Sequence, residues 1–376
     1  MKIKICIGSL NIGGAEKQAL SFADYLYQKK YDVEVLALSA GKNTLHNKSI
    51  CPVRVLLPFK GNNRLMNLIH FLSLPFKLRE YLSGNEQMVL STYGDACNVI
   101  GFMASLYKKN VSLIWGVRRS HLGGLYSDEW KIYCIEKIGA LFNTKVDKII
   151  YNSHAAVKFY KEKFAYSNPH TYVIYNAIDL DRFKNKSALK REKIGLREEA
   201  IVIGVFSRVI ASKGYLFFIG AFSALKKEHK HLQALIVGPS DKVFIEQLKE
   251  KCIALEIDKD IIFSGPREDL QDIYPLIDIY CSPSLSEGTS NVILEAMASE
   301  KPCVVTDVGD SRLIVPSENI VVKPADSMAL YEGIQQMISR KAHWDEIGQI
   351  NRQHTFTHFS MSNNFTALEQ AYSEKK

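Results

Sequence analysis

Two glutamates, Glu287 and Glu295, flank a small polar turn in the stretch SEGTSNVILEAMA, residues 286–298. The apolar run before the turn predicts a strand, and the apolar spacing after it predicts a helix that begins near Ser290 or Asn291. The first turn of such a helix offers N–H donors and a positive dipole end to a phosphate. Carboxylates beside a phosphate can accept hydrogen bonds from hydroxyl groups, which sugars carry in number. The alternative is structural, with Glu287 stabilising the helix start and Glu295 solvated.

A second polar loop, SRVIASKG at residues 207–214, carries Arg208 and Lys213 directly after a predicted strand. Fixed cations at the mouth of a strand-end crevice can bind a diphosphate, and an arginine can do so through two hydrogen bonds. Taken alone, the two side chains are more simply explained as solvated surface cations.

Two further loops follow predicted strands. Gly13 and Gly14 open a helix, where paired glycines let the backbone approach an anionic group, although a glycine turn is also common without a ligand. Pro266 and Arg267 follow another strand, and such a loop can border a flat pocket for a base. Neither loop has the GxGxxG spacing of a dinucleotide-binding fingerprint, and this argues against a dehydrogenase.

The elements that must position these loops alternate between short β-branched runs and longer helical patterns. Strands are predicted at 3–9, 33–39, 88–92, 112–117, 148–153 and 172–177, and again at 201–207, 232–238, 261–265, 279–284, 303–308 and 320–324. This βαβ rhythm predicts parallel sheets covered by helices, with ligand sites at the carboxyl ends of the strands. A charged stretch near 178–200 separates the two series. The α/β fold class with two doubly wound, Rossmann-like domains follows.

The chain of 376 residues is longer than a single hydrophobic core usually supports, which favours two domains. Its composition is that of an ordinary globular protein. Its seven cysteines have neither disulfide-framework nor zinc spacing, so buried free thiols are predicted. No apolar run reaches the length of a spanning helix, and the first residues lack a signal-peptide pattern, so a cytoplasmic location is expected. The net charge of +8 lies in residues 1–185 (25 − 14 = +11), since residues 186–376 carry 23 − 26 = −3. This asymmetry indicates either an anionic partner surface or simply a lysine-rich exterior.

With these motifs together, the sequence resembles family 4 retaining glycosyltransferases of the GT-B fold, and in particular bacterial members that build capsular, O-antigen or other surface polysaccharides. The resemblance covers nearly the whole chain and rests on five segments: GGAE at 13–16, NSHA at 152–155, YNAIDLDRF at 175–183, SRVIASKG at 207–214 and SEGTSNVILEAMA at 286–298 with KPCVVTDVG at 301–309. It implies two Rossmann-like domains that face each other across a cleft, at 1–185 and 186–358. A C-terminal helix at 359–376 would cross back to the first domain.

The resemblance also implies a role for each site residue. Arg208 and Lys213 would bind the diphosphate of a nucleotide sugar, and Glu287 would hold hydroxyls of the transferred sugar. Glu295 would hold the ribose, and Pro266 and Arg267 would border the base. The remaining donor-binding residues would be Gly13, Gly14, Gly288, Thr289, Ser290 and Asn291.

On the acceptor side, WGVRRSHLGG at 115–124 matches relatives only loosely. His121 is a catalytic candidate there and Arg118 an acceptor-side candidate, and a surface basic turn explains both equally well. The donor would be a nucleoside diphosphate sugar, with UDP favoured, and the acceptor a glycan or lipid-linked glycan. Neither a cofactor nor a nucleic-acid partner is expected. Asp179 and Asp181 spell DxD, but their place in the connection between the domains favours a capping or hinge role over metal binding, so no metal requirement is expected.

Two alternatives stay open. A non-catalytic cytoplasmic protein that binds nucleotide sugars would show the same loops. The stretch NNRLMNLIHFLSLPFKLREYL at 62–82 mixes cations with apolar residues and could rest on an anionic membrane at the inner face of the cell, or it could be a packed core helix interrupted at Pro75.

Overall fold

The computed structural model describes residues 2–11, 13–41, 49–57, 64–120, 129–184 and 186–374. The chain forms two compact units. The first unit contains the described residues up to Asn176 and those from Asn364 onward, and the second runs Ala177–Asn363. The chain passes from the first unit to the second at 176/177 and returns to the first at 363/364. The sequence predicted these boundaries at 185/186 and 358/359.

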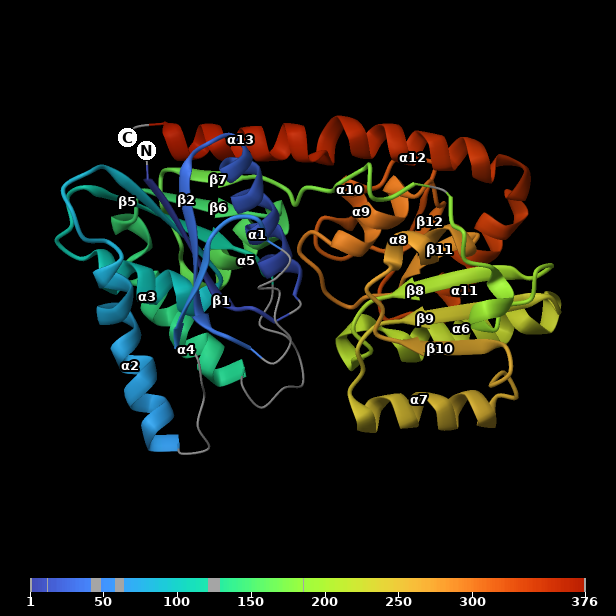
Figure 1. The fold of residues 1–376 in the computed structure, drawn as a ribbon. Coiled ribbons are helices and arrows are strands. Elements are labelled where there is room, and N and C mark those ends of the chain that lie inside the picture. Colours follow the sequence, from blue (N-terminus) through green and yellow to red (C-terminus); the bar gives the residue numbers. More distant parts are fainter. Residues whose placement is uncertain are drawn as a thin grey trace. The chain divides into compact units, whose positions relative to one another are not determined.

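The first unit is built on a parallel sheet with the strand order β3-β2-β1-β4-β5-β6-β7 (Figure 1). Its strands are β1 (Lys2–Ser9), β2 (Asp32–Ser39), β3 (Val53–Leu57), β4 (Met88–Tyr93), β5 (Val111–Val117), β6 (Lys148–Tyr151) and β7 (Thr171–Val173). All six strands predicted for this half are present. The edge strand β3 was missed, since a five-residue apolar run interrupted by Arg54 is too short to identify a strand by its period.

Helices cover both faces of this sheet (Figure 1). They are α1 (Gly14–Gln28), α2 (Arg64–Glu80), α3 (Asp95–Ser105), α4 (Glu129–Ala140) and α5 (His154–Phe164). The start of α5 is fixed by its N-cap, because the Ser153 hydroxyl accepts a hydrogen bond from the Ala156 N–H at 3.1 Å. Apolar side chains from α2, α3 and α5 join those of the sheet in one buried cluster, which holds the strand ends in place.

The second unit has its own parallel sheet, with the strand order β10-β9-β8-β11-β12-β13. Its strands are β8 (Ile201–Phe206), β9 (Leu232–Val237), β10 (Ile261–Gly265), β11 (Ile279–Ser282), β12 (Cys303–Thr306) and β13 (Ile320–Val322). Its helices are α6 (Tyr215–Glu228), α7 (Lys242–Ala254), α8 (Leu270–Ile273), α9 (Asn291–Ala298), α10 (Ser311–Ile314), α11 (Ser327–Ser339) and α12 (Trp344–Phe359). Each strand predicted for this half is confirmed.

The chain between the units is tied to the second one. The Arg352 guanidinium on α12 donates to the carbonyls of Leu180 at 3.1 Å and Phe183 at 2.5 Å. The Asp179 carboxylate accepts hydrogen bonds from two backbone N–H groups that follow it, at 3.0 and 3.2 Å, whereas the Asp181 side chain is exposed. The capping role expected for the first aspartate of this DxD string is therefore present.

The C-terminal helix α13 (Met361–Ser373) supplies core residues to the first unit. The ring of Phe365 lies 5.3 Å from that of Phe22 and 5.4 Å from that of Tyr25, both on α1. The buried Lys148 ammonium on β6 donates to the carbonyls of Ala371 at 2.6 Å and Glu374 at 2.7 Å, which satisfies the end of the helix.

Among the described residues, no helix has the length and apolar character needed to cross a membrane.

The buried Phe365 gives a first prediction. Phe365→Ala should lower the free energy of unfolding by about 3–5 kcal/mol, since it removes a ring that is 1% exposed and leaves a cavity against α1. Phe356→Ala on α12, where the ring is 57% exposed, is the matched control and should change stability by less than about 1 kcal/mol. Urea unfolding measures both. Equal losses would contradict the packing of α13 on the first unit.

Candidate active site

The candidate site lies where the order of the C-terminal sheet reverses. Strands β8 and β11 are neighbours although two strands, β9 and β10, and three α-helices separate them along the chain. The chain leaves β8 towards one edge of the sheet and β11 towards the other. Such a switch point leaves a crevice at the carboxyl ends of the two strands. Arg208 and Lys213 follow β8, and Glu287 follows β11, so the fold brings the predicted diphosphate and sugar ligands to the same crevice.

Lys213 and Glu287 form a direct ion pair. The Lys213 ammonium donates to Oε1 of Glu287, and the Ser284 hydroxyl donates to the same oxygen at 2.7 Å. The two charged side chains keep only 15% and 10% of their surface exposed. A carboxylate so placed is fixed in orientation, and its charge is already compensated at the site where a diphosphate is expected.

Two glycines make this approach possible. Gly214 has φ +71°, and a Cβ there would lie 1.8 Å from the carbonyl oxygen of Pro283 at the end of β11. Gly309 has φ +57°, and a Cβ there would lie 2.2 Å from the carbonyl oxygen of Glu287. Any other residue at either position would push the loops apart, because left-handed backbone and close backbone contact both require glycine. The loop that contains Glu287 therefore packs closely against the loops that follow β8 and β12.

The helix that follows Glu287 presents an uncapped start. α9 begins at Asn291, and Ser290 in the N-cap position makes no side-chain cap bond. Thr289 and Ser290 are buried, and Gly288 is half-buried, so the turn is a packed part of the crevice rather than a surface loop. Backbone N–H groups and the helix dipole in this position suit a phosphate.

Glu295 lies one turn into α9 and is oriented by a buried tyrosine. The Tyr274 hydroxyl donates to Oε2 of Glu295 at 3.1 Å and to the Val292 carbonyl at 3.0 Å. Burial, with the nearby charge of Glu295, raises the pKa of Tyr274 far above its usual value, so the hydroxyl stays a donor. This carboxylate is half-buried, and its held orientation fits a ligand for hydroxyl groups better than a solvated surface charge.

The two arginines of this unit that the sequence singled out differ in their contacts. Arg208 is exposed, and its guanidinium makes no hydrogen bond or ion pair with any residue that the structure describes. Arg267, in the loop after β10 that begins with Pro266, is held by Asp269 at 2.9 and 2.5 Å. That contact lowers the pKa of the Asp269 carboxyl. Arg208 is thus open to an anionic ligand, whereas Arg267 mainly shapes its own loop.

Three of the remaining predicted residues, Gly13, Gly14 and Arg118, follow strands of the N-terminal sheet at their carboxyl ends. Gly13 is the N-cap of α1 and Gly14 its first residue, and a Cβ at Gly13 would lie 2.2 Å from a carboxylate oxygen of Glu16. The Arg118 guanidinium lies 4.5 Å from the ring centre of Tyr93, and its buried Nε has no partner among the described residues. His121 lies outside the described residues.

Sequence reasoning missed an acidic cluster in this unit. Asp95 opens α3 after β4 and pairs with Arg119 after β5, with 3.0 Å between Nε and Oδ2. Beneath them, the buried Glu136 on α4 accepts hydrogen bonds from the Tyr160 and Tyr166 hydroxyls, both at 2.9 Å. Burial and the Asp95 charge raise the pKa of Glu136 to about 9. A single glutamate within an amphipathic helix gives no local sign of this, since its partners come from other elements.

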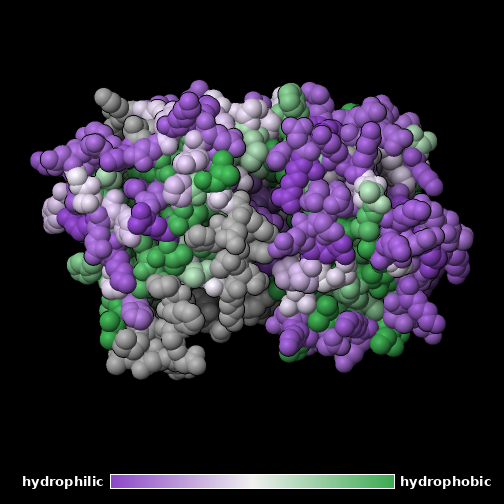
Figure 2. All heavy atoms as spheres, in the orientation of Figure 1, coloured by the Kyte–Doolittle hydropathy of each residue, from purple (hydrophilic) through white to green (hydrophobic). Residues whose placement is uncertain are grey.

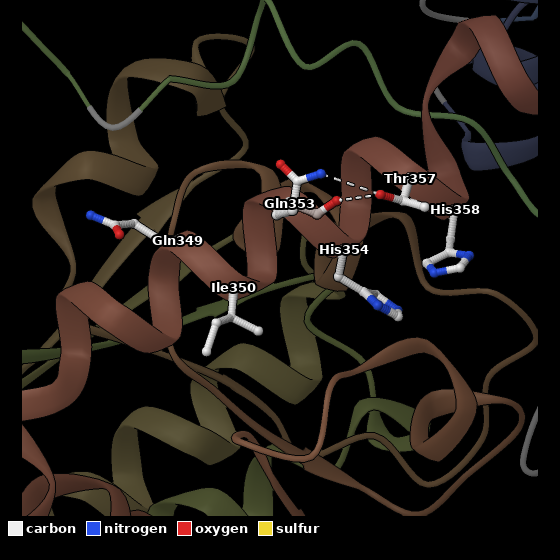
Figure 3. Close-up of a pocket in the computed structure, with 6 residues that line it drawn as sticks. All are labelled: Gln349, Ile350, Gln353, His354, Thr357 and His358. Carbon is white, nitrogen blue, oxygen red and sulfur yellow. Dashed lines mark hydrogen bonds between the residues drawn. The ribbon is translucent and has the colours of Figure 1, made fainter.

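A shallow depression of about 500 Å³ lies along α12 (Figure 3). Its lining comes from one helix and consists of Gln349, Ile350, Gln353, His354, Thr357 and His358. The rings of the two histidines are 4.5 Å apart, and burial lowers the pKa of His354. None of the predicted site residues lines this depression.

The part of the chain that the structure describes contains no cluster of three or more histidine, cysteine, aspartate or glutamate side chains placed to hold a metal ion.

Comparison with known proteins agrees with this arrangement. Residues 12–182 match the family model described as "Glycosyltransferase Family 4", and residues 200–340 match "Glycosyl transferases group 1". The two parallel, Rossmann-like sheets are those of the GT-B fold. The chain belongs to the glycosyltransferases, with a family 4 domain followed by a group 1 domain, and is a transferase enzyme.

Named relatives come from bacterial polysaccharide assembly. The chain is 22% identical to the capsular polysaccharide biosynthesis glycosyltransferase CapM of Staphylococcus aureus, over 93% of this chain and 91% of that protein. It is also 22% identical to a Campylobacter jejuni N-acetylgalactosamine-N,N'-diacetylbacillosaminyl-diphospho-undecaprenol 4-alpha-N-acetylgalactosaminyltransferase, with 90% of each chain covered. Anabaena HepE in complex with UDP and glucose has the same fold, at a TM-score of 0.84 and 20% identity over 100% of both chains.

The buried Glu136 predicts a pH-dependent stability. Its pKa rises from 4.5 in the unfolded chain to about 9 in the folded protein, so across that interval only the folded state keeps the proton. This contribution to stability is complete below the lower value and disappears as the pH rises through the upper one. Glu136→Gln cannot titrate. In urea unfolding, the stability of the wild type relative to this variant should therefore fall between about pH 5.5 and about pH 8.5.

The exposed Glu250 on α7 supplies the control, since Glu250→Gln should leave the pH profile of the wild type unchanged. Parallel profiles for the wild type and Glu136→Gln would show that Glu136 is ionised in the fold.

Proposed function

We propose that this enzyme transfers a sugar from a nucleoside diphosphate sugar, with UDP as the nucleotide, to a glycan or lipid-linked glycan acceptor. The anomeric configuration would be retained, and the product would belong to a surface polysaccharide. The observation that carries the donor assignment is the crevice between β8 and β11. There Lys213 pairs with Glu287, the start of α9 has no side-chain cap, and Tyr274 orients Glu295. Together these features suit a diphosphate between two hydroxyl-bearing groups.

In this proposal each end of the donor has its own carboxylate. Glu287 accepts hydrogen bonds from the transferred sugar, and Glu295 accepts them from the ribose. Lys213 and Ser284 both donate to Oε1 of Glu287. Because these contacts hold the carboxylate in place and lower its nucleophilicity, a role as hydroxyl ligand fits better than a role as attacking nucleophile. Tyr274 donates to Oε2 of Glu295 and so holds this carboxylate in a fixed orientation for the ribose.

The chemical step needs stabilisation of negative charge. The bond between the anomeric carbon and the β-phosphate oxygen breaks as the acceptor hydroxyl attacks the anomeric carbon. Negative charge develops on the departing diphosphate, and one of its oxygens takes the proton that the hydroxyl loses. Arg208, Lys213 and the N-terminus of α9 would stabilise that charge, and fixed dipoles and cations in a protected site do so without reorganisation. In this assignment the departing group is stabilised by side chains and backbone of the protein itself.

The acceptor assignment rests on the relatives and on the N-terminal unit. The Campylobacter relative is named for a glycan on diphospho-undecaprenol. Arg118 and Arg119 stand at the carboxyl ends of the N-terminal strands, where they could contact a polar or anionic acceptor. A lipid-linked acceptor would place the enzyme peripherally on the cytoplasmic face of the membrane.

The donor is identified by measuring the release of nucleoside diphosphate from UDP-glucose, UDP-galactose, UDP-N-acetylglucosamine and GDP-mannose. We expect turnover with at least one UDP-sugar and none with GDP-mannose. Turnover with GDP-mannose alone would refute the UDP assignment and leave the class of reaction intact.

Removing each of the two carboxylates should affect a different quantity, kcat for Glu287 and UDP affinity for Glu295. Glu287→Ala should lower kcat about 100-fold to 1,000-fold while the Kd for UDP changes little, since its contacts are with the reacting sugar. Glu295→Ala should weaken UDP binding about 10-fold to 100-fold, as expected for the loss of hydrogen bonds to a charged group. Steady-state kinetics and calorimetry separate the two effects. Glu250→Ala on α7 is the control, and unchanged UDP affinity in Glu295→Ala would refute the ribose assignment.

The reaction is also predicted to proceed in EDTA at its full rate, because the crevice supplies its own cations. Loss of transfer in EDTA that Mg²⁺ or Mn²⁺ restores would contradict this assignment.

A further inference from the structure

The outer side of three helices in the N-terminal unit is unusually apolar. More than half of the large hydrophobic side chains that are exposed in the described residues belong to α2, α3 and α4 or to the residues that directly follow them. We call this surface the apolar face. Its most exposed members are Leu72 at 61%, Phe76 at 73%, Tyr107 at 95%, Trp130 at 64% and Leu141 at 70%. Scattered single residues of this kind are normal, but a gathering on adjoining helices indicates a contact surface.

The three helices form one continuous layer. α2 packs on α3, and α3 packs on α4. The Arg79 guanidinium on α2 fastens the first pair, because it donates to the carbonyls of Ala104 at 3.0 Å and Leu106 at 2.7 Å at the end of α3. Figure 2 shows hydrophobic atoms on the part of this unit where Figure 1 places these helices.

The core does not account for the exposed side chains. The inner side of the layer packs on the sheet through Leu74 and Leu78 of α2 and Ile100 of α3, which are at most 4% exposed. On α2, Leu72 and Phe76 are four residues apart and so share one stripe on the solvent side. The outer side is therefore available to a partner at no cost to the fold.

The apolar face is also basic. The segments 69–82, 103–109 and 130–145 contain seven lysine or arginine residues and two glutamates, of which Glu136 is buried. Cations adjoin aromatic rings here, with the Lys131 ammonium 6.0 Å from the centre of Trp130 and that of Lys137 5.5 Å from the centre of Tyr133. Aromatic rings beside lysines are typical of surfaces that lie at the boundary between lipid headgroups and acyl chains.

We propose that the apolar face docks on an anionic lipid bilayer, with its hydrophobic side chains among the headgroups and its lysines against lipid phosphates. Charge complementarity favours a bilayer as the partner. At an anionic bilayer the exposed lysines can contact lipid phosphates while the neighbouring apolar side chains contact the acyl region. Only the biological role of this docking, which is to bring the enzyme to a lipid-linked acceptor, rests on the proposed function. Docking itself is independent of the donor site.

The test is flotation of the full-length protein with vesicles of about 30% phosphatidylglycerol in phosphatidylcholine, compared with pure phosphatidylcholine. The wild type should bind the anionic vesicles and lose most of that binding in high salt. The variant Leu72→Ser/Phe76→Ser/Trp130→Ser should bind about tenfold less at low salt. Lys108→Glu/Lys109→Glu/Lys131→Glu should lose the preference for anionic vesicles.

The matched control is Val243→Ser/Met328→Ser/Phe356→Ser in the second unit, whose side chains are 57% to 68% exposed and which should bind as the wild type does. Release of nucleoside diphosphate with a water-soluble acceptor should persist in every variant, so its loss would count against the proposed function instead. Two results would overturn the proposal: wild-type protein that does not float with anionic vesicles, or a dimer in solution that the serine variant converts to a monomer.

Discussion

The contact between Lys213 and Glu287 sets the geometry of the C-terminal site. It joins two loops that are far apart in the sequence and meet only because β8 and β11 are neighbours. The approach depends on backbone that passes within reach of other backbone, at Gly214 against Pro283 and at Gly309 against Glu287. A carboxylate can be retained in such a buried place because a cation compensates its charge. In the proposed function, this pair would set a ligand for the sugar beside a ligand for the diphosphate.

The three candidate cations of this unit differ in the side chains that they contact. Lys213 is engaged with Glu287, Arg267 with Asp269, and Arg208 with no described residue. A free, exposed guanidinium can attract and grip an incoming anion, whereas a paired one mainly fixes the shape of the site. Three positive residues near one crevice therefore need not have the same role, although their types alone suggest that they do.

In the N-terminal unit, helix α4 serves two environments at once. Its inner side carries Glu136 into a cluster with Asp95 and two tyrosines, where burial favours the neutral acid. Its outer side carries Trp130 and exposed lysines. The 3.6-residue period of the helix separates the two by only a few positions in sequence. The same short segment can therefore stabilise the strand-end loops and offer a surface to a partner.

The sequence by itself determined the two βαβ series, the chain positions of nearly all the strands, and the loop residues at their carboxyl ends. These follow from local apolar period and from turn chemistry, which any segment carries within itself. Strand β3 was missed because its five residues, interrupted by Arg54, are too few to show a strand period. The tertiary structure alone decided that Lys213 pairs with Glu287, that Tyr274 orients Glu295, that Glu136 meets Asp95 and that α13 packs on α1. Each of these contacts joins segments remote in sequence, and strand order, which brings such segments together, leaves no mark in the local pattern of residues.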